Sequence, residues 1–180
     1  MSAWLTWAEA AEATWLGQHI AESTVVFPTL EGVHLLGLAL SVGLIALTDL
    51  RLLGWLLRDL PAAAVHRQLR PWVLSGFALV FGSGLLLFFA EAVTLINSPA
   101  FPFKLLFIAL AGVNALYFEL RLAQRLPGPH DAIAALPEVS VGDAAARAAL
   151  PRAVRAAAAA SLLLWLAVVV CGRLIPYLPH

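Results

Sequence analysis

One apolar segment, residues 25–57, constrains the fold most, because it is long enough to cross a bilayer as a helix. It carries Glu31 and His34 near one end, and Asp49 and Arg51 near the other. Ionisable side chains inside a membrane segment are costly and usually face protein or water rather than lipid. The segment therefore predicts a membrane protein and makes these four side chains candidate functional residues.

The composition indicates that lipid is the solvent for the rest of the chain as well. Of the 180 residues, 62% are hydrophobic and only 12% are charged, whereas soluble domains carry about 25% charged residues. The length allows about four spans, so we expect a single membrane domain, 1–180. The net charge of +0 gives no reason to expect nucleic acid as a partner. Membrane lipid is the predicted partner.

Helical periodicity and turn residues divide the chain into an interfacial helix and four spans. Trp4, Trp7 and Trp15 fall on one helical face, which is typical of an amphipathic helix anchored at the headgroup level. We place the start of the second span at Pro71. The predicted fold class is an all-α, integral membrane four-helix bundle. Its expected elements are an interfacial helix at 2–20, spans at 25–57, 71–95, 102–122 and 154–174, and a cytoplasmic polar connection at 127–151.

Arginine is concentrated in two of the loops between these spans. Loops rich in Lys and Arg stay on the cytoplasmic side, so we predict that both termini face outward (N-out, C-out). Only Lys104 and Arg173 lie on the other side. The loop arginines are Arg51, Arg58, Arg67 and Arg70 in the first case, and Arg121, Arg125, Arg147, Arg152 and Arg155 in the second.

Four ionisable side chains are expected to meet in the outer half of the bundle. Residues three or four apart share a helix face, which places Glu31 and His34 on one stripe of the first span. Lys104 lies in the first turn of the third span, and Glu91 lies near the outer end of the second. Glu31 and His34 have the Glu-x-x-His spacing by which one helix offers a metal both an oxygen and a nitrogen ligand.

Three interpretations of this outer group stay open. In the first, Glu31, His34 and Glu91 bind a metal ion and Lys104 balances their charge. In the second, the same residues relay protons, since a buried Glu–His pair can titrate near neutral pH. In the third, Glu31 and Lys104 form a structural salt bridge and His34 is a hydrogen-bonded core residue.

Haem b bound through His34 is a further alternative cofactor. A bis-histidine haem needs two histidines at one depth on facing helices. His66 lies about 30 Å from His34 along the helix axis, which is too far for both to bind one haem. The second ligand would have to be His19 on a folded-back N-terminal helix, or His34 of a second copy in a homodimer.

A second charged group lies at the inner end of the bundle, and we interpret it as an anchor to the headgroups. Asn114, deep in the third span, is expected to hydrogen-bond across helices as a packing residue. The charged members of this group are Asp49, Arg51, His66, Arg70, Glu119 and Arg121.

Four short segments of the first three spans, together with Asn114, carry a family resemblance: FPTLEGVHLLG at 27–37, DLRLLG at 49–54, RPW at 70–72 and SPAFPFKLL at 98–106. They look like those of an uncharacterised bacterial inner-membrane family that is broadly similar to four-helix proteins of the copper-resistance D type. The resemblance implies a multi-pass protein of the bacterial inner membrane with metal or redox handling. This chain lacks the several intramembrane histidines or methionines of a copper carrier, which counts against copper. The positions that the resemblance singles out are Glu31, His34, Asp49, Arg51, Arg70, Lys104 and Asn114.

The sequence shows no nucleophile with a base, no phosphate loop and no soluble catalytic domain, so we do not expect an enzyme. The first function hypothesis is a binding or transport module built on the outer Glu/His/Lys group. The second is an electron-transfer subunit that binds haem b through His34. The third is an accessory or structural subunit of a larger membrane complex, with the Trp-rich N-terminal helix as its docking surface.

Overall fold

The computed structural model describes residues 3–126 and 150–177, and every regular element in these two ranges is helical. Four helical stretches are long and apolar enough to cross a membrane, so the protein is a multi-pass membrane protein. The predicted cytoplasmic connection, 127–151, lies almost wholly outside the described residues. The elements are α1 (Ala3–Glu12), α2 (Trp15–Glu22), α3 (Val26–Leu53), α4 (Ala62–Asn97), α5 (Ala100–Tyr117), η1 (Phe118–Leu122), η2 (Ala123–Arg125), α8 (Arg152–Leu174) and η3 (Ile175–Tyr177).

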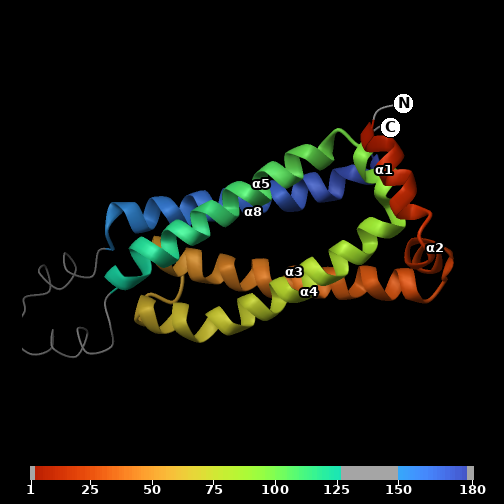
Figure 1. The fold of residues 1–180 in the computed structure, drawn as a ribbon. Coiled ribbons are helices and arrows are strands. Elements are labelled where there is room, and N and C mark those ends of the chain that lie inside the picture. The colour runs from red at the N-terminus through yellow and green to blue at the C-terminus, as the bar shows by residue number, and fades with distance from the viewer. Residues whose placement is uncertain (1–2, 127–149, 178–180) are drawn as a thin grey trace, which may run out of the picture.

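The long helices form two pairs, α3 with α4 and α5 with α8, and α3 also packs against α8 (Figure 1). The short helices α1 and α2 lie against the last part of α4. The chain starts and finishes at this same end of the bundle (Figure 1). We call it the N-terminal end, and we call the opposite end, where α3 finishes and α4 begins, the arginine-rich end.

Large apolar side chains cover the outside of the bundle. Leu36 is 70% exposed, Val113 66% and Leu163 67%, and each lies in a helix long enough to span a membrane. A soluble monomer rarely carries so continuous an apolar surface. These side chains are therefore the ones that contact lipid.

The second long helix begins earlier than the sequence analysis places the second span. α4 starts at Ala62 and contains Pro71 in its interior. A helix of this length measures about 54 Å, whereas the hydrocarbon core of a bilayer is about 30 Å thick. Pro71 therefore marks the start of the apolar part of the helix and not the start of the helix. α3, in turn, finishes at Leu53, short of the expected 57, because Gly54 adopts a left-handed conformation (φ 79°) that terminates helices.

The N-terminal segment forms two helices where one was expected. Thr14 interrupts the helix: its hydroxyl donates to the Ala11 carbonyl at 2.7 Å and accepts from the Gly17 amide at 3.1 Å, which caps α2. Trp4 and Trp15 remain largely exposed. That these indoles anchor the segment at a membrane interface stays a prediction.

α3 and α4 approach closely at a contact of small residues. A Cβ atom on Gly76 would lie 2.7 Å from the backbone nitrogen of Ser41, and one on Gly37 would lie 2.9 Å from the Leu79 Cβ. Ser41 is fully buried, and its hydroxyl donates to the Gly37 carbonyl at 2.8 Å. Small residues bring membrane helices together in this way because helix association in lipid depends on close packing.

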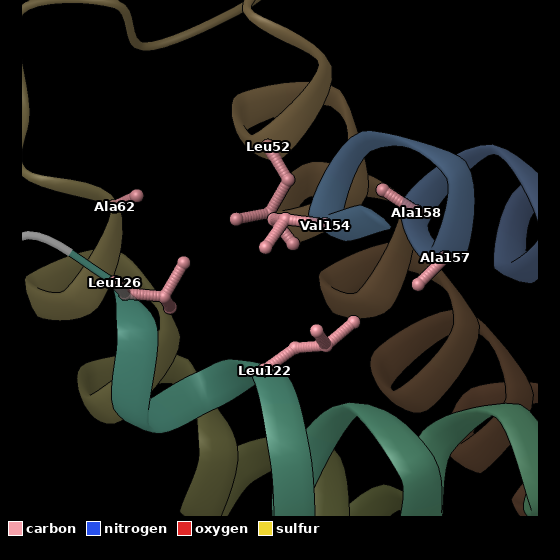
Figure 2. Packing of buried hydrophobic residues seen from close by; sticks show 7 residues of the cluster. All are labelled: Leu52, Ala62, Leu122, Leu126, Val154, Ala157 and Ala158. Atoms are coloured by element: carbon pink, nitrogen blue, oxygen red, sulfur yellow. The ribbon is translucent and has the colours of Figure 1, made fainter. Parts of the chain in front are cut away.

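The apolar core lies in separate clusters along the bundle. One fills the arginine-rich end, where side chains from α3, α4, α8 and the η1–η2 segment converge (Figure 2). Another lies halfway along, around Ala111, Trp165 and Val168. The members of the first cluster are Leu52, Ala62, Leu122, Leu126, Val154, Ala157 and Ala158.

Candidate functional site

A cavity of ≈ 210 Å³ lies inside the arginine-rich half of the bundle. All four long helices contribute to its wall, together with η1. Most of the wall is apolar, but it includes ionisable side chains from α3, α4 and η1. We call it the polar cavity, and its polar lining consists of Thr48, Asp49, His66, Arg70, Asn114, Glu119 and Ser161.

Glu119 is the centre of the charged group in this cavity. Its Oε1 atom lies 3.2 Å from His66 Nε2, and Arg70 Nε donates to the same oxygen at 3.2 Å. The side chain of His66 is 15% exposed, that of Glu119 35% and that of Arg70 55%. The pair of ionic contacts thus runs from the interior toward the mouth of the cavity. The His66 ring also packs edge-on against Phe118 at 5.3 Å.

A change of helical register places Glu119 in the wall. α5 is α-helical as far as Tyr117 and continues as a π-helical turn, Phe118–Leu122. A π turn widens the helix and rotates the residues that follow it, and such turns are frequent at functional sites. Leu122, the last residue of the turn, is buried in the cluster of Figure 2 and holds the turn in place.

Asp49 is the unusual member of the lining. It is only 6% exposed, and its Oδ2 atom has no hydrogen-bond partner. Buried polar atoms nearly always have a partner, because a lone buried oxygen loses the hydrogen bonds that it makes to water. The Asp49 oxygen is therefore the position in the cavity with the greatest need for a ligand.

Two neutral polar residues of the wall have already used hydrogen-bond donors within the protein. Asn114 Nδ2 donates to the Ala157 carbonyl of α8 at 3.0 Å, so the expected bond across helices is present. The Thr48 hydroxyl donates to the Leu44 carbonyl at 2.9 Å. The Asn114 amide oxygen and the Thr48 lone pairs remain as acceptors.

The N-terminal half holds the residues that the sequence analysis proposed as a site. His34 Nδ1 lies 3.1 Å from the Ser83 hydroxyl of α4, and a Cβ on Gly84 would lie 3.0 Å from the His34 ring. The imidazole therefore fills the interface of α3 and α4. Lys104 approaches α8 instead, where its Nζ would lie 3.6 Å from a Cβ on Gly172.

The two outer carboxylates do not join His34 in a compact group. Glu31 and Glu91 are both exposed, and Glu91 sits at a kink in α4, with φ −136° and ψ 28°. Among residues 3–126 and 150–177, no three His, Cys, Asp or Glu side chains are arranged to hold a metal ion. In the same ranges the only ion pairs are those of Glu119, so a Glu31–Lys104 bridge is not formed. The metal interpretation of Glu31, His34 and Glu91 gains no support from this arrangement.

Glu12 contacts α4 beside the kink at Glu91, and the sequence analysis did not predict this contact. Glu12 of α1 accepts a hydrogen bond from the Val93 amide at 2.8 Å. Gly17 of α2 lies so close to α4 that a Cβ there would be 2.6 Å from the Phe89 carbonyl oxygen. The two N-terminal helices therefore pack directly on the break in α4, and Glu12 satisfies an amide that the break releases.

An apolar layer separates the two polar regions. Phe77 and Trp165 pack with their ring centroids 5.1 Å apart, and Ala111 and Val168 belong to the same layer. In α4, α5 and α8 these residues lie between the polar residues of the cavity and the N-terminal end. Trp165 and Phe77 also form part of the cavity wall, so the cavity finishes at this layer.

Comparison with known proteins identifies a family for this chain. The family model described as "Family of unknown function (DUF6644)" matches residues 4–178. The chain belongs to this family. No curated protein and no solved structure matches the chain. The similarity to copper-resistance D proteins that the sequence suggested therefore has no support, and the DUF6644 family adds no activity of its own.

For this DUF6644 member the structure changes the interpretation of the inner charged residues. Asp49, His66, Arg70 and Glu119 line a cavity, whereas we expected them to anchor the bundle to headgroups. Arg121 is exposed, and the group of six is therefore divided. Sequence patterns show that such residues lie at one depth in the membrane, but they do not show whether the helices that carry them enclose a cavity.

Proposed function

We propose that this membrane protein binds a small, positively charged ligand in the polar cavity, with the Asp49 carboxylate as its anchor. The observation that carries the proposal is the buried Oδ2 atom of Asp49, which has no partner in a cavity of ≈ 210 Å³. A ligand that donates a hydrogen bond or brings a positive charge removes the cost of burying that oxygen.

The charges in the cavity favour a cation. The Arg70 guanidinium is already paired with Glu119, and His66 contacts the same carboxylate oxygen. Among the residues that the structure describes, Asp49 has no cation within ion-pair distance. With His66 neutral and Asp49 ionised, the lining carries one surplus negative charge, which a singly charged cation balances.

The neutral groups of the wall favour the same kind of ligand. Asn114 and Thr48 offer acceptors in the same wall as Asp49, and acceptors suit the N–H donors of an ammonium group. Phe77, Phe118 and Trp165 supply aromatic faces and edges in the same wall, and aromatic faces attract cations. The volume equals that of about seven water molecules, so we propose a small alkylammonium compound as the ligand class.

Thermal unfolding of the purified protein in detergent tests this proposal. The probes are methylammonium, tetramethylammonium and choline chloride, each compared with sodium chloride at equal ionic strength. We expect at least one ammonium probe to raise the unfolding temperature of the natural protein, and Asp49→Asn to abolish that rise. Asp59→Asn is the matched control, because Asp59 is an exposed carboxylate at the same end of the bundle and outside the lining.

A cavity-filling variant gives an independent measurement. Ala115→Leu adds apolar volume to the wall and leaves Asp49 and its hydrogen bond to Ser161 in place, so we expect it to fold and to lose the response to the ammonium probes. No response in the natural protein, or an undiminished response in Asp49→Asn, would contradict the proposal.

A second candidate function, a proton relay in the N-terminal half, is favoured by the bond between His34 and Ser83. An imidazole that bonds a hydroxyl across two helices is a common element of intramembrane proton paths. Proteoliposomes with a pH gradient and an internal pH dye test it: His34→Ala should slow dissipation of the gradient, and Ser75→Ala, an exposed hydroxyl on α4, should not. Elemental analysis and an absorption spectrum of the same samples test the metal and haem b hypotheses.

We also propose that the protein lies in a bacterial inner membrane with its arginine-rich end in the cytoplasm. The excess of arginine in the loops at that end supports this orientation. In a Cys171→Ala background, a cysteine at Asn97 should react with a membrane-impermeant maleimide in intact cells. A cysteine at Arg58 should react only after lysis, and the reverse pattern would invert the topology.

A further inference from the structure

A second hollow, of ≈ 420 Å³, opens at the arginine-rich end, outside the polar cavity. It is formed by the end of α3, the loop that follows it and the start of α8. Leu52, which is only 2% exposed, borders both this hollow and the polar cavity and separates them. We call it the arginine hollow, and its lining includes Arg51, Arg58, Arg155, Trp55, Leu53 and Leu150.

The arginine hollow has a surplus of positive charge. Three guanidinium groups line it, and among residues 3–126 and 150–177 no carboxylate does. Asp59 lies near enough to Arg51 to interact with its charge, but it is outside the lining. In the part of the chain that the structure describes, none of the three arginines forms an ion pair. The hollow is therefore suited to an anion.

One of these guanidinium groups is held in place by the loop. Arg51 Nε donates to the Leu60 carbonyl at 2.7 Å. This bond leaves the two terminal nitrogens of Arg51 as donors, and a guanidinium fork matches two oxygens of a phosphate.

Neighbouring residues place the arginine hollow at the level of the headgroups. Trp55 is 67% exposed, and tryptophan prefers the boundary between the acyl chains and water. Leu53, the last residue of α3, and Leu150 supply apolar surface beside the arginines. A ligand with a phosphate and an acyl chain matches both parts of this lining.

We infer that the arginine hollow binds the phosphate of an anionic lipid headgroup. Basic pockets between membrane helices recognise such headgroups by charge and by bidentate hydrogen bonds. The chemistry recognised is that of an anionic phosphate group, which a lipid headgroup and free phosphate share, so the experiment must separate these two sources. The inference is independent of ligand binding in the polar cavity.

Native mass spectrometry of the full chain, purified in detergent, tests the inference. The probes are phosphatidylglycerol and cardiolipin, with phosphatidylcholine as the zwitterionic reference. We expect the double variant Arg58→Gln, Arg155→Gln to bind the anionic probes about tenfold more weakly, since each arginine near the surface contributes substantially to the attraction. The matched control is Arg67→Gln, Arg121→Gln, which removes the same charge from exposed positions at the same end and should change binding less than about twofold.

Inorganic phosphate, added at millimolar concentration, separates the two sources. If it leaves the bound lipid in place, the lipid assignment is supported; if it displaces the lipid, the assignment to a lipid is overturned. No preference for anionic probes, or an equal loss in both double variants, would also overturn it. Unfolding temperatures verify that the variants fold, and Arg58→Gln alone, a change in an exposed loop residue, replaces the double variant if that one does not.

Discussion

Each half of the bundle contains one group of two carboxylates, one imidazole and one longer cation, and the two groups are arranged differently. At the arginine-rich end, ionic contacts link Glu119 to His66 and Arg70 around a cavity. At the N-terminal end, Glu31 and Glu91 are exposed, His34 packs against α4 and Lys104 approaches α8. The two sets are Asp49, Glu119, His66 and Arg70, and Glu31, Glu91, His34 and Lys104.

Packing explains the difference. Toward the N-terminal end, α4 is in tight contact with its neighbours through glycines, with Gly84 against the His34 ring and Gly17 against the Phe89 carbonyl. These contacts hold α4 close to α3 and to the N-terminal helices. At the other end, the π turn at Phe118–Leu122 widens α5 beside the polar cavity. Residue type and spacing are therefore insufficient to make a site, because the separation of the helices decides whether side chains can converge.

The largest effect is expected where α3 and α4 are in closest contact. Gly76→Ala places a methyl group 2.7 Å from the Ser41 backbone nitrogen, and overpacking of this kind costs about 1–3 kcal/mol. The measurement is thermal unfolding in detergent. Gly82→Ala is the control, because nothing lies within 4 Å of that position and alanine stabilises a helix relative to glycine by up to about 1 kcal/mol. Equal changes in the unfolding temperature of the two variants would show that α3 and α4 are not tightly packed at Gly76.

The next effect concerns the ionic contacts at the arginine-rich end. Glu119→Gln weakens the contacts to both His66 and Arg70, and we expect a loss of about 1–2 kcal/mol, since these groups are partly exposed. Glu91→Gln changes an exposed carboxylate without an ion pair in the described residues and should cost less. The unfolding free energy of each variant is measured in the same detergent. A larger loss for Glu91→Gln would reverse the contrast between the two halves.

A smaller effect is expected at the break in α4. Glu12→Ala removes the acceptor of the Val93 amide, and the loss of a helix cap typically costs about 1 kcal/mol. Hydrogen exchange should show faster exchange of the Val93 amide in this variant. Glu9→Ala, an exposed change on the same helix, should leave that rate unaltered. An unchanged rate in Glu12→Ala would mean that α1 does not hold the break.

The smallest effect belongs to the hydrogen bond that Asn114 forms between α5 and α8. Asn114→Ala removes the hydrogen bond to the Ala157 carbonyl, and bonds of this kind between membrane helices contribute about 0.6 kcal/mol on average. Thermal unfolding is the measurement, with Asn97→Ala, at the exposed end of α4, as the control. A loss as large as that of Gly76→Ala would show that polar bonds, and not small residues, dominate the packing.

Sequence alone determined that this protein has four membrane spans and where they lie. Hydropathy is a sum over neighbouring residues, so the apolar runs are visible without any knowledge of contacts. The position of Asn114, deep in the third span, also predicted its hydrogen bond across helices, which the structure contains. The predicted ends of the helices were less accurate. Pro71 was taken as the start of the second span but lies inside α4, and Thr14 was not recognised as the residue that separates α1 from α2.

Only the tertiary structure decided which polar groups meet. His34 and Lys104 lie at similar depths, yet one enters the α3–α4 interface and the other approaches α8. Asp49 and Glu119 look like headgroup anchors in the sequence, yet they line one cavity with His66. The physical reason is that hydropathy depends only on neighbouring residues in the sequence. Whether side chains converge depends on the rotation of each helix and on its distance from the next helix. Contacts between residues far apart in the sequence, such as Gly76 and Ser41, control both.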